Sequence, residues 1–113
     1  MLFSSNLFES IPGILPQESV QEIASRSGIT IERIVSAGHR SPEGFWYDQD
    51  WDEWVLLVSG TAGLQIEEQP DIVQLHPGDH LMIPAHTRHR VAWTDKKHRT
   101  IWLAVHIHSV KNL

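Results

Sequence analysis

The chain of 113 residues contains no cysteine. This absence excludes disulfide bonds, thiolate metal ligands and cysteine nucleophiles together. Long apolar runs are missing as well: a run such as Val55-Leu56-Leu57-Val58 is far shorter than the roughly 20 residues that a transmembrane helix needs. The first residues also lack a basic segment followed by a long apolar stretch. We therefore expect no membrane association, no signal peptide and a cytoplasmic location.

Basic residues are scarce too, with 9 Lys and Arg against 14 Asp and Glu and a formal net charge of −5. Nucleic-acid binding needs a positive field around the phosphates, so we expect no nucleic-acid partner. The rest of the composition is that of an ordinary globular protein, 41% hydrophobic and 20% charged. At this length it predicts one compact domain spanning residues 1–113.

The first 28 residues are predicted to form an N-terminal arm followed by a short helix over residues 17–26. Val20, Ile23 and Ala24 give an apolar stripe at helical spacing. Pro16 suits the first turn of a helix, and Gly28 suits its end.

From residue 29 to 108 the apolar pattern changes to a period of two, which indicates strands. Strong β propensity and regular turn signals divide this region into short strands, and many short strands predict a β-sandwich or barrel. Ser59-Gly60-Thr61 and Glu68-Gln69-Pro70-Asp71 are predicted to be hairpin turns. The predicted strands cover residues 29–36, 46–47, 54–59, 62–67, 72–75, 80–83, 89–93 and 100–108.

The strand that follows Glu53 carries apolar residues on both faces. If Glu53 points into the barrel, Val55 and Leu57 follow it, and the outward face is Trp54, Leu56 and Val58. Such an outward face is too apolar for contact with water. We expect the N-terminal arm or a second subunit to cover it.

Gly78, Pro84 and His89 form one spaced group of residues, and Glu53 and Gly60 form another. Both groups resemble motifs of the cupin superfamily. The first has the intervals of the second cupin motif, although His86 replaces its second glycine and Trp93 replaces its asparagine. Glu53 and Gly60 match the second half of the first motif. Tyr47 and Gln49 stand where that motif has two histidines. The resemblance spans roughly residues 36–106 and extends to small single-domain bacterial cupins of unassigned function.

The resemblance implies an all-β, cupin-type jelly-roll barrel over residues 29–108 and a homodimer. It also places a metal site at His89, Glu53, Gln49 and Tyr47. Neutral amide and phenol groups are weak ligands, so a divalent ion such as Mn, Fe, Ni or Zn would be held loosely. The alternative is a metal-free polar pocket in which the same side chains bind an organic ligand.

Roles follow for individual residues if the protein is an enzyme. Glu53 would act as a general base and Tyr47 as a proton donor. Trp93 shares the predicted strand face of His89 and is expected to contact the small-molecule substrate, with His86 and His39 near the mouth of the barrel. The facing of His106 and His108 on the last strand stays open.

Two functions remain open from the sequence. The first is a small-molecule enzyme acting on a metabolite, and the second is a non-catalytic module that binds or senses one. Fold does not decide between them, because the cupin barrel hosts many chemistries.

Overall fold

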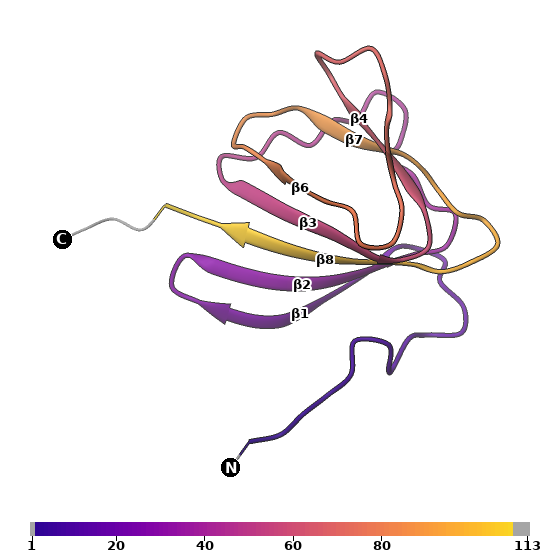
Figure 1. The fold of residues 1–113 in the computed structure, drawn as a ribbon, viewed down its shortest axis with the longest axis vertical. Helices are drawn as coiled ribbons and strands as arrows, with labels where there is room; N and C mark the ends of the chain where they lie inside the picture. The colour runs from indigo at the N-terminus through magenta and orange to yellow at the C-terminus, as the bar shows by residue number, and fades with distance from the viewer. Residues whose placement is uncertain (1, 110–113) are drawn as a thin grey trace.

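The computed structural model describes residues 2–109, which form eight strands in two sheets (Figure 1). The larger sheet has the strand order β1-β2-β8-β3-β6, and the smaller has β5-β4-β7. All strand pairs are antiparallel. The strands are β1 (Ser19–Arg26), β2 (Ile29–Ser36), β3 (Asp52–Ser59), β4 (Ala62–Ile66), β5 (Val73–Leu75), β6 (His80–Ile83), β7 (His89–Thr94) and β8 (Thr100–Ile107).

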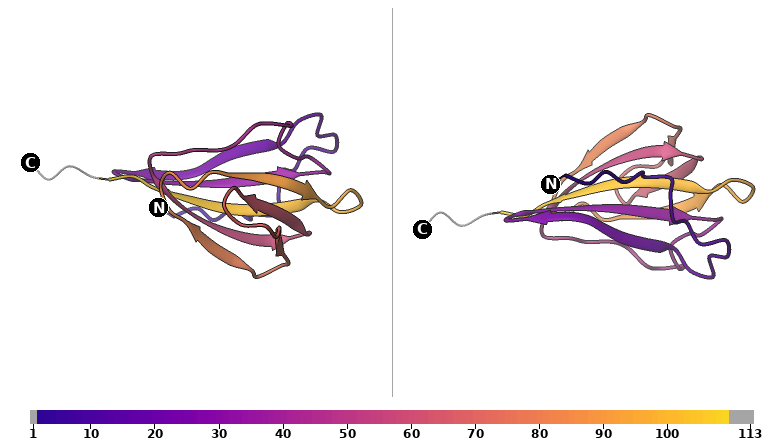
Figure 2. Two further views of the ribbon diagram at one scale, coloured as in Figure 1. Left: turned by 90° about the horizontal axis from the view of Figure 1, so that it is seen from above. Right: turned by 90° about the horizontal axis from the view of Figure 1, so that it is seen from below.

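The two sheets lie over one another and enclose the core, as the turned views show (Figure 2). Leu57 and Ala62 are fully buried at its centre, where β3 passes into β4, and Trp102 of β8 packs against them at 4% exposure. Inward-facing apolar side chains from both sheets therefore form one interior, as expected for a sandwich. The all-β prediction of a cupin-type jelly roll is confirmed.

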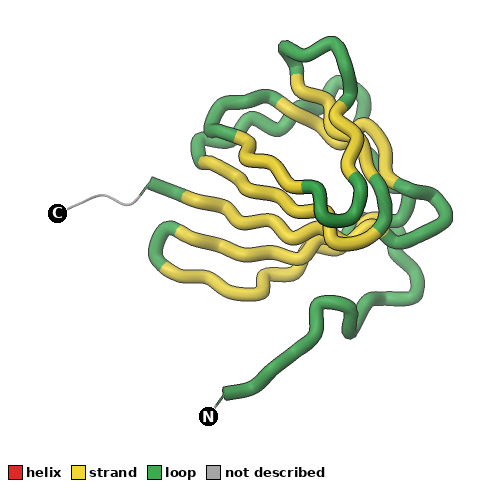
Figure 3. Tube along the Cα trace, viewed as in Figure 1, coloured by secondary structure: helices red, strands yellow, loops and turns green. Residues whose placement is uncertain are grey.

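The predicted helix over residues 17–26 is wrong, because this segment is strand β1 (Figure 3). It pairs with β2 along its whole length, and Gly28 makes the connecting turn at φ 78°. A β-bulge places Ile23 outside the ladder, between Glu22 and Ala24. The bulge explains the misleading apolar spacing, since it shifts the alternation of facing by one residue. Backbone pairing along β2 outweighs the weak helical preference of so short a segment.

Ser59-Gly60-Thr61 is not a hairpin turn. It carries the chain from β3 in the larger sheet to β4 in the smaller one. Gly60 has φ 83°, and a Cβ atom there would lie 2.5 Å from Thr100 Oγ1. The glycine is therefore required twice, by the left-handed conformation and by the close approach of β8. The second predicted turn, residues 68–71, does connect a hairpin, because β4 pairs with β5.

Strand β3 has the facing that follows from an inward Glu53. Glu53, Val55 and Leu57 are buried, whereas the outward-facing side chains of the strand are partly exposed. The N-terminal arm covers a different part of this outer surface, at β2. There the buried Arg33 guanidinium donates hydrogen bonds to the backbone carbonyls of Leu7 and Glu9, at 2.9 and 2.6 Å.

Two further features concern the segment before β3 and the absence of long helices from residues 2–109. The predicted strand at residues 46–47 is reduced to one isolated bridge between Tyr47 and His89. Within residues 2–109 no helix has the length and apolarity needed to cross a membrane.

Candidate functional site

A cavity of about 440 Å³ lies between the two sheets. Segment 47–55 builds one wall with every second residue, first from the loop before β3 and then from the strand itself: Tyr47, Gln49, Trp51, Glu53 and Val55. The opposite wall comes from alternate residues of β2 (Thr30, Glu32 and Ile34), and the floor includes Trp102 and His106 of β8. The period-two pattern of the strands therefore sorts these side chains into the interior.

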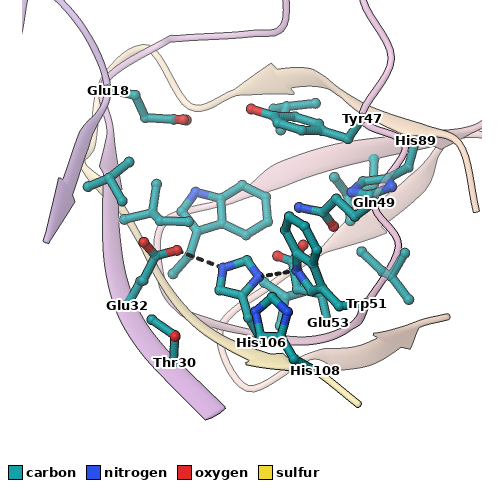
Figure 4. Close-up of a pocket in the computed structure, with 17 residues that line it drawn as sticks. Glu18, Thr30, Glu32, Tyr47, Gln49, Trp51, Glu53, His89, His106 and His108 are labelled. Atoms are coloured by element: carbon teal, nitrogen blue, oxygen red, sulfur yellow. Dashed lines mark hydrogen bonds and ion pairs between the residues drawn. The ribbon is translucent and has the colours of Figure 1, made fainter. Parts of the chain in front are cut away.

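The four predicted metal-site residues, Tyr47, Gln49, Glu53 and His89, all line this cavity (Figure 4). Tyr47 and His89 are joined by two backbone hydrogen bonds, of 2.7 and 3.1 Å. Their rings stack with centroids 5.3 Å apart. The loop before β3 is thereby fixed to β7, so the two halves of the predicted site are held together by backbone contacts.

Glu53 is 9% exposed, and burial raises the pKa of its carboxyl above the ordinary value of 4.5. Protonated His106 and His89 would oppose this rise electrostatically, and the Gln49 side chain opposes it as well, whereas Glu32 adds to it. Burial disfavours the charged form more strongly than these neighbours favour it. Glu53 can therefore hold a proton under conditions in which an exposed glutamate is ionised.

The His89 imidazole is 4% exposed and has a defined orientation. Its Nδ1 lies 2.8 Å from the backbone carbonyl of Thr87. A carbonyl oxygen can only accept, so Nδ1 carries the hydrogen. We find no hydrogen-bond partner for Nε2 among the described residues. This nitrogen is left for a ligand in the cavity.

Burial likewise raises the pKa of Tyr47, with further contributions from the negative charges of Glu18 and Glu53. The side chain is therefore a neutral phenol at ordinary pH, which can donate one hydrogen bond. Figure 4 shows its hydroxyl directed toward Glu18, on the other side of the cavity from His106 and His108.

A chain of three polar side chains crosses the floor of the cavity (Figure 4). The Trp51 indole Nε1 donates to His106 Nδ1 at 2.8 Å, and His106 Nε2 lies 2.6 Å from Glu32 Oε1. An indole N–H can only donate, so His106 Nδ1 carries no proton and Nε2 carries one. His106 is thus a neutral imidazole that donates to Glu32.

Trp51, Glu18 and Glu32 also line the cavity, as do His106 and His108, whose facing the sequence left open. Nothing local in the sequence shows that Glu18, just before β1, or the Glu32 face of β2 turns inward. The alternation Trp102, Ala104, His106 was the available signal. The register of β8 between β2 and β3 turns this face toward the cavity.

The three predicted substrate contacts lie outside the main cavity. Trp93 does not share the facing of His89, because a bulge at Ala92 shifts β7 by one residue and pairs Trp93 with Gly63. His86 is exposed in a turn at φ 64°, with its Nδ1 3.5 Å from Asp48. His39 lines a smaller adjoining cavity of about 230 Å³.

The residues fit a divalent metal ion only partly. Of the four predicted ligands, only Glu53 and His89 are strong metal-binding types, and Gln49 and Tyr47 are neutral. In residues 2–109 no three His, Cys, Asp or Glu side chains are gathered as a metal ion would require. We derive no chemical step through a metal.

Comparison with known proteins gives consistent results. A family model described as a cupin domain matches residues 34–106. A candidate mannose-6-phosphate isomerase from Ralstonia eutropha JMP134 is 49% identical, with a TM-score of 0.91, over 96% of this chain and 100% of that chain. A cupin superfamily protein from Desulfitobacterium hafniense DCB-2 is 23% identical, with a TM-score of 0.72, over 88% and 84% of the two chains. An RmlC-like cupin from Desulfovibrio desulfuricans is 15% identical, with a TM-score of 0.71, over 96% and 97%.

The last two similarities show a shared fold alone. A comparison with curated proteins finds no match.

Proposed function

Because the chain belongs to the cupin family, we propose that it is a small-molecule cupin that binds an organic metabolite in the cavity between its sheets. The observation that carries this proposal is the cavity itself. Its volume of about 440 Å³ is within the range of known ligand pockets. Buried polar groups, Glu53 and His89, border it beside apolar and aromatic walls. This combination of many apolar contacts and few polar ones is typical of ligand pockets.

The proposal is tested by filling the cavity. Val91 lines it, so Val91→Trp should occupy much of the space. Met82→Trp is the matched control, because Met82 is 50% exposed and is not among the cavity residues. Small molecules released from denatured wild type and from both variants are compared by mass spectrometry, together with thermal shifts against a metabolite panel. A ligand retained by Met82→Trp and lost by Val91→Trp supports the proposal, and equal retention by both variants contradicts it.

A second candidate function is proton-transfer catalysis, favoured by the raised pKa of Glu53. A carboxyl group whose pKa approaches the working pH is suited to act as general acid or base. Tyr47, a buried phenol on the same cavity, would donate the second hydrogen bond or proton. Once a ligand is identified, Glu53→Gln should abolish turnover while leaving ligand binding measurable. Turnover unaffected by this change would contradict the proton-transfer role of Glu53.

A bound Mn, Fe, Ni or Zn ion stays a separate prediction. It is supported by the orientation of His89, whose Nδ1 is held by a backbone carbonyl, as is usual for metal-ligating histidines. Elemental analysis of untagged protein prepared without chelator tests it, beside a Glu53→Ala/His89→Ala double variant. Near-stoichiometric metal in wild type alone would establish the ion.

The 49% identical protein from R. eutropha suggests a sugar phosphate as one ligand to try. The cavity offers sugars suitable contacts in its aromatic walls and its carboxylates. It offers the phosphate group little, since none of the described cavity residues is Lys or Arg. We therefore rank unphosphorylated compounds ahead of sugar phosphates in the panel.

We also propose that the protein is a homodimer. The N-terminal arm carries exposed large apolar side chains, including Phe3 at 87% and Ile14 at 85%, and Met82 adds another on the outer face of β6. Apolar surface of this kind is favourably buried against a second copy. Light scattering on the purified protein would give twice the chain mass, and a single-chain mass would contradict the proposal. Cytoplasmic location stays a prediction from the sequence.

A further inference from the structure

The balance of charge in the cavity is one-sided. Three carboxyl groups border it, those of Glu18, Glu32 and Glu53. Within the described part of the chain, no Lys or Arg lines this cavity. Arginine side chains elsewhere have other partners: Arg33 binds the N-terminal arm, and Arg90 binds the carbonyls of Ser41 and Pro42. Arg40 is exposed and lines the smaller adjoining cavity.

His106 does not supply a positive charge on the cavity floor. His106 is kept neutral by its two hydrogen bonds, because the Trp51 N–H occupies Nδ1 and Glu32 accepts from Nε2. The partner of Glu32 in this chain is therefore a neutral donor. Glu18 accepts a hydrogen bond from the Ser36 hydroxyl at 2.6 Å, which is also a neutral donor.

The cavity also presents an acceptor that no described residue uses. His89 is 4% exposed, and its Nδ1 hydrogen is held by the Thr87 carbonyl. In the neutral ring Nε2 is consequently an acceptor, and it borders the cavity without a hydrogen-bond partner. Nε2 keeps some surface open to the cavity, so a bound molecule can reach it. It calls for a ligand that carries N–H or O–H groups.

Aromatic side chains form much of the remaining wall. Trp51, Trp102 and Tyr47 all line the cavity, and the faces of such rings attract organic cations. Carboxylates, a free acceptor and aromatic faces are each suited to an alkylammonium group. None of them is suited to a phosphate or a carboxylate.

We infer that the cavity ligand is a small organic cation, an amine bound as its ammonium form between the carboxylates of Glu18 and Glu32 and the aromatic wall. This inference rests on the proposed small-molecule function and narrows it to one class of ligand. A neutral sugar or alcohol would satisfy His89 but would leave the carboxylates without a counter-charge. An anion would add repulsion in a partly desolvated space, where like charges interact strongly.

The test uses three probes of similar size and different charge: cyclohexylammonium, cyclohexanol and cyclohexyl phosphate. Dissociation constants are measured by NMR on the full-length protein, with the Trp51 indole resonance as a reporter inside the cavity. Cyclohexylammonium should bind at least about 10-fold more tightly than either other probe, which corresponds to about 1.4 kcal/mol. The same spectra should show His106 protonated at Nε2 and not at Nδ1.

Charge variants sharpen the test without removing hydrogen-bond acceptors. Glu32→Gln and Glu18→Gln keep a side-chain oxygen for His106 and Ser36, so the variants should fold. Each should weaken cyclohexylammonium binding several-fold and leave cyclohexanol binding unchanged. Glu68→Gln, at an exposed loop position, is the control and should change neither.

The outcomes separate the inference from the function on which it rests. Binding of cyclohexanol or cyclohexyl phosphate as tightly as the ammonium probe would overturn the inference and keep the cavity as a binding site. Ammonium binding that is equally tight in Glu32→Gln, Glu18→Gln and Glu68→Gln would overturn it too. No shift of cavity resonances with any probe would overturn both.

Discussion

The chain Trp51–His106–Glu32 should stabilise the fold, and His106→Phe is the change that removes it. Phenylalanine keeps a planar ring on the cavity floor but accepts nothing from Trp51 and donates nothing to Glu32. The lost bonds are a neutral one from Trp51, of 2.8 Å, and a charge-assisted one to Glu32, of 2.6 Å. The side chains of His106 and Glu32 are 13% and 24% exposed. A neutral bond contributes about 1 kcal/mol and a charged one about 1.5–3 kcal/mol, so we expect a loss of about 2–4 kcal/mol.

The structure offers a matched control for this change. Trp54 Nε1 donates to His80 Nδ1 at 3.3 Å in an exposed pair on the outside of the sheet. Among residues 2–109 no carboxylate pairs with the second nitrogen of His80. His80→Phe should therefore cost less than about 1 kcal/mol. Urea unfolding followed by tryptophan fluorescence gives both values, and the His106→Phe midpoint should fall by more than about 1 M. Equal losses in the two variants would refute a stabilising role for the buried chain.

A double-mutant cycle identifies the source of the effect. Glu32→Gln alone should destabilise the protein, because it replaces a charged acceptor of His106 with a neutral one. In the His106→Phe background the same change should be neutral or stabilising, since it removes a carboxylate that has lost its donor. An additive result would contradict the direct Glu32–His106 bond.

Three further predictions concern other parts of the molecule. Burial raises the folded-state pKa of Glu53, so its contribution to stability is fully present below the ordinary pKa of 4.5 and is lost as the pH rises through the folded-state value. The stability of Glu53→Gln relative to wild type, measured by urea titration, should therefore increase from pH 4 to pH 8. A constant difference between the two proteins would contradict this. Gly60→Ala should destabilise the protein by at least about 2 kcal/mol more than Gly44→Ala. Both glycines have φ near 80°, but only at Gly60 would a Cβ atom meet the Thr100 backbone, at 2.6 Å. Equal losses of stability would assign the cost to φ alone. Arg33→Met should release the N-terminal arm and speed its proteolytic cleavage near Leu7, with the barrel left intact, and unchanged cleavage would show that the arm is held in another way.

Much of the barrel could be predicted from sequence because its strands obey a local rule. The alternation along β3 tied the facing of Val55 and Trp54 to that of Glu53, and in the structure Glu53 points inward. The cupin-like spacing of Gly78, Pro84 and His89 likewise placed His89 on the interior. Such features depend on neighbouring residues alone, so the sequence carries them directly.

The errors arise where facing depends on a distant partner. Bulges at Ile23 and Ala92 are set by the registers with β2 and β4, and each reverses the facing of the residues beyond it. The first bulge gave strand β1 the spacing of a helix, and the second moved Trp93 out of the cavity. The facing of His106 depends in the same way on where β8 enters the larger sheet. No local pattern contains that information.

The position of β8 also has a consequence for how the protein forms in the cell. This strand is the last of the eight in chain order, yet it lies between β2 and β3 and pairs with both. Until it has left the ribosome, β2 and β3 each present an unpaired edge that could pair with another nascent chain. Glu32 and His106 are separated by 74 residues, so the cavity floor is also assembled only at this step. Nascent chains that lack β8 should consequently depend on chaperones, and the binding site should appear together with the closed sheet.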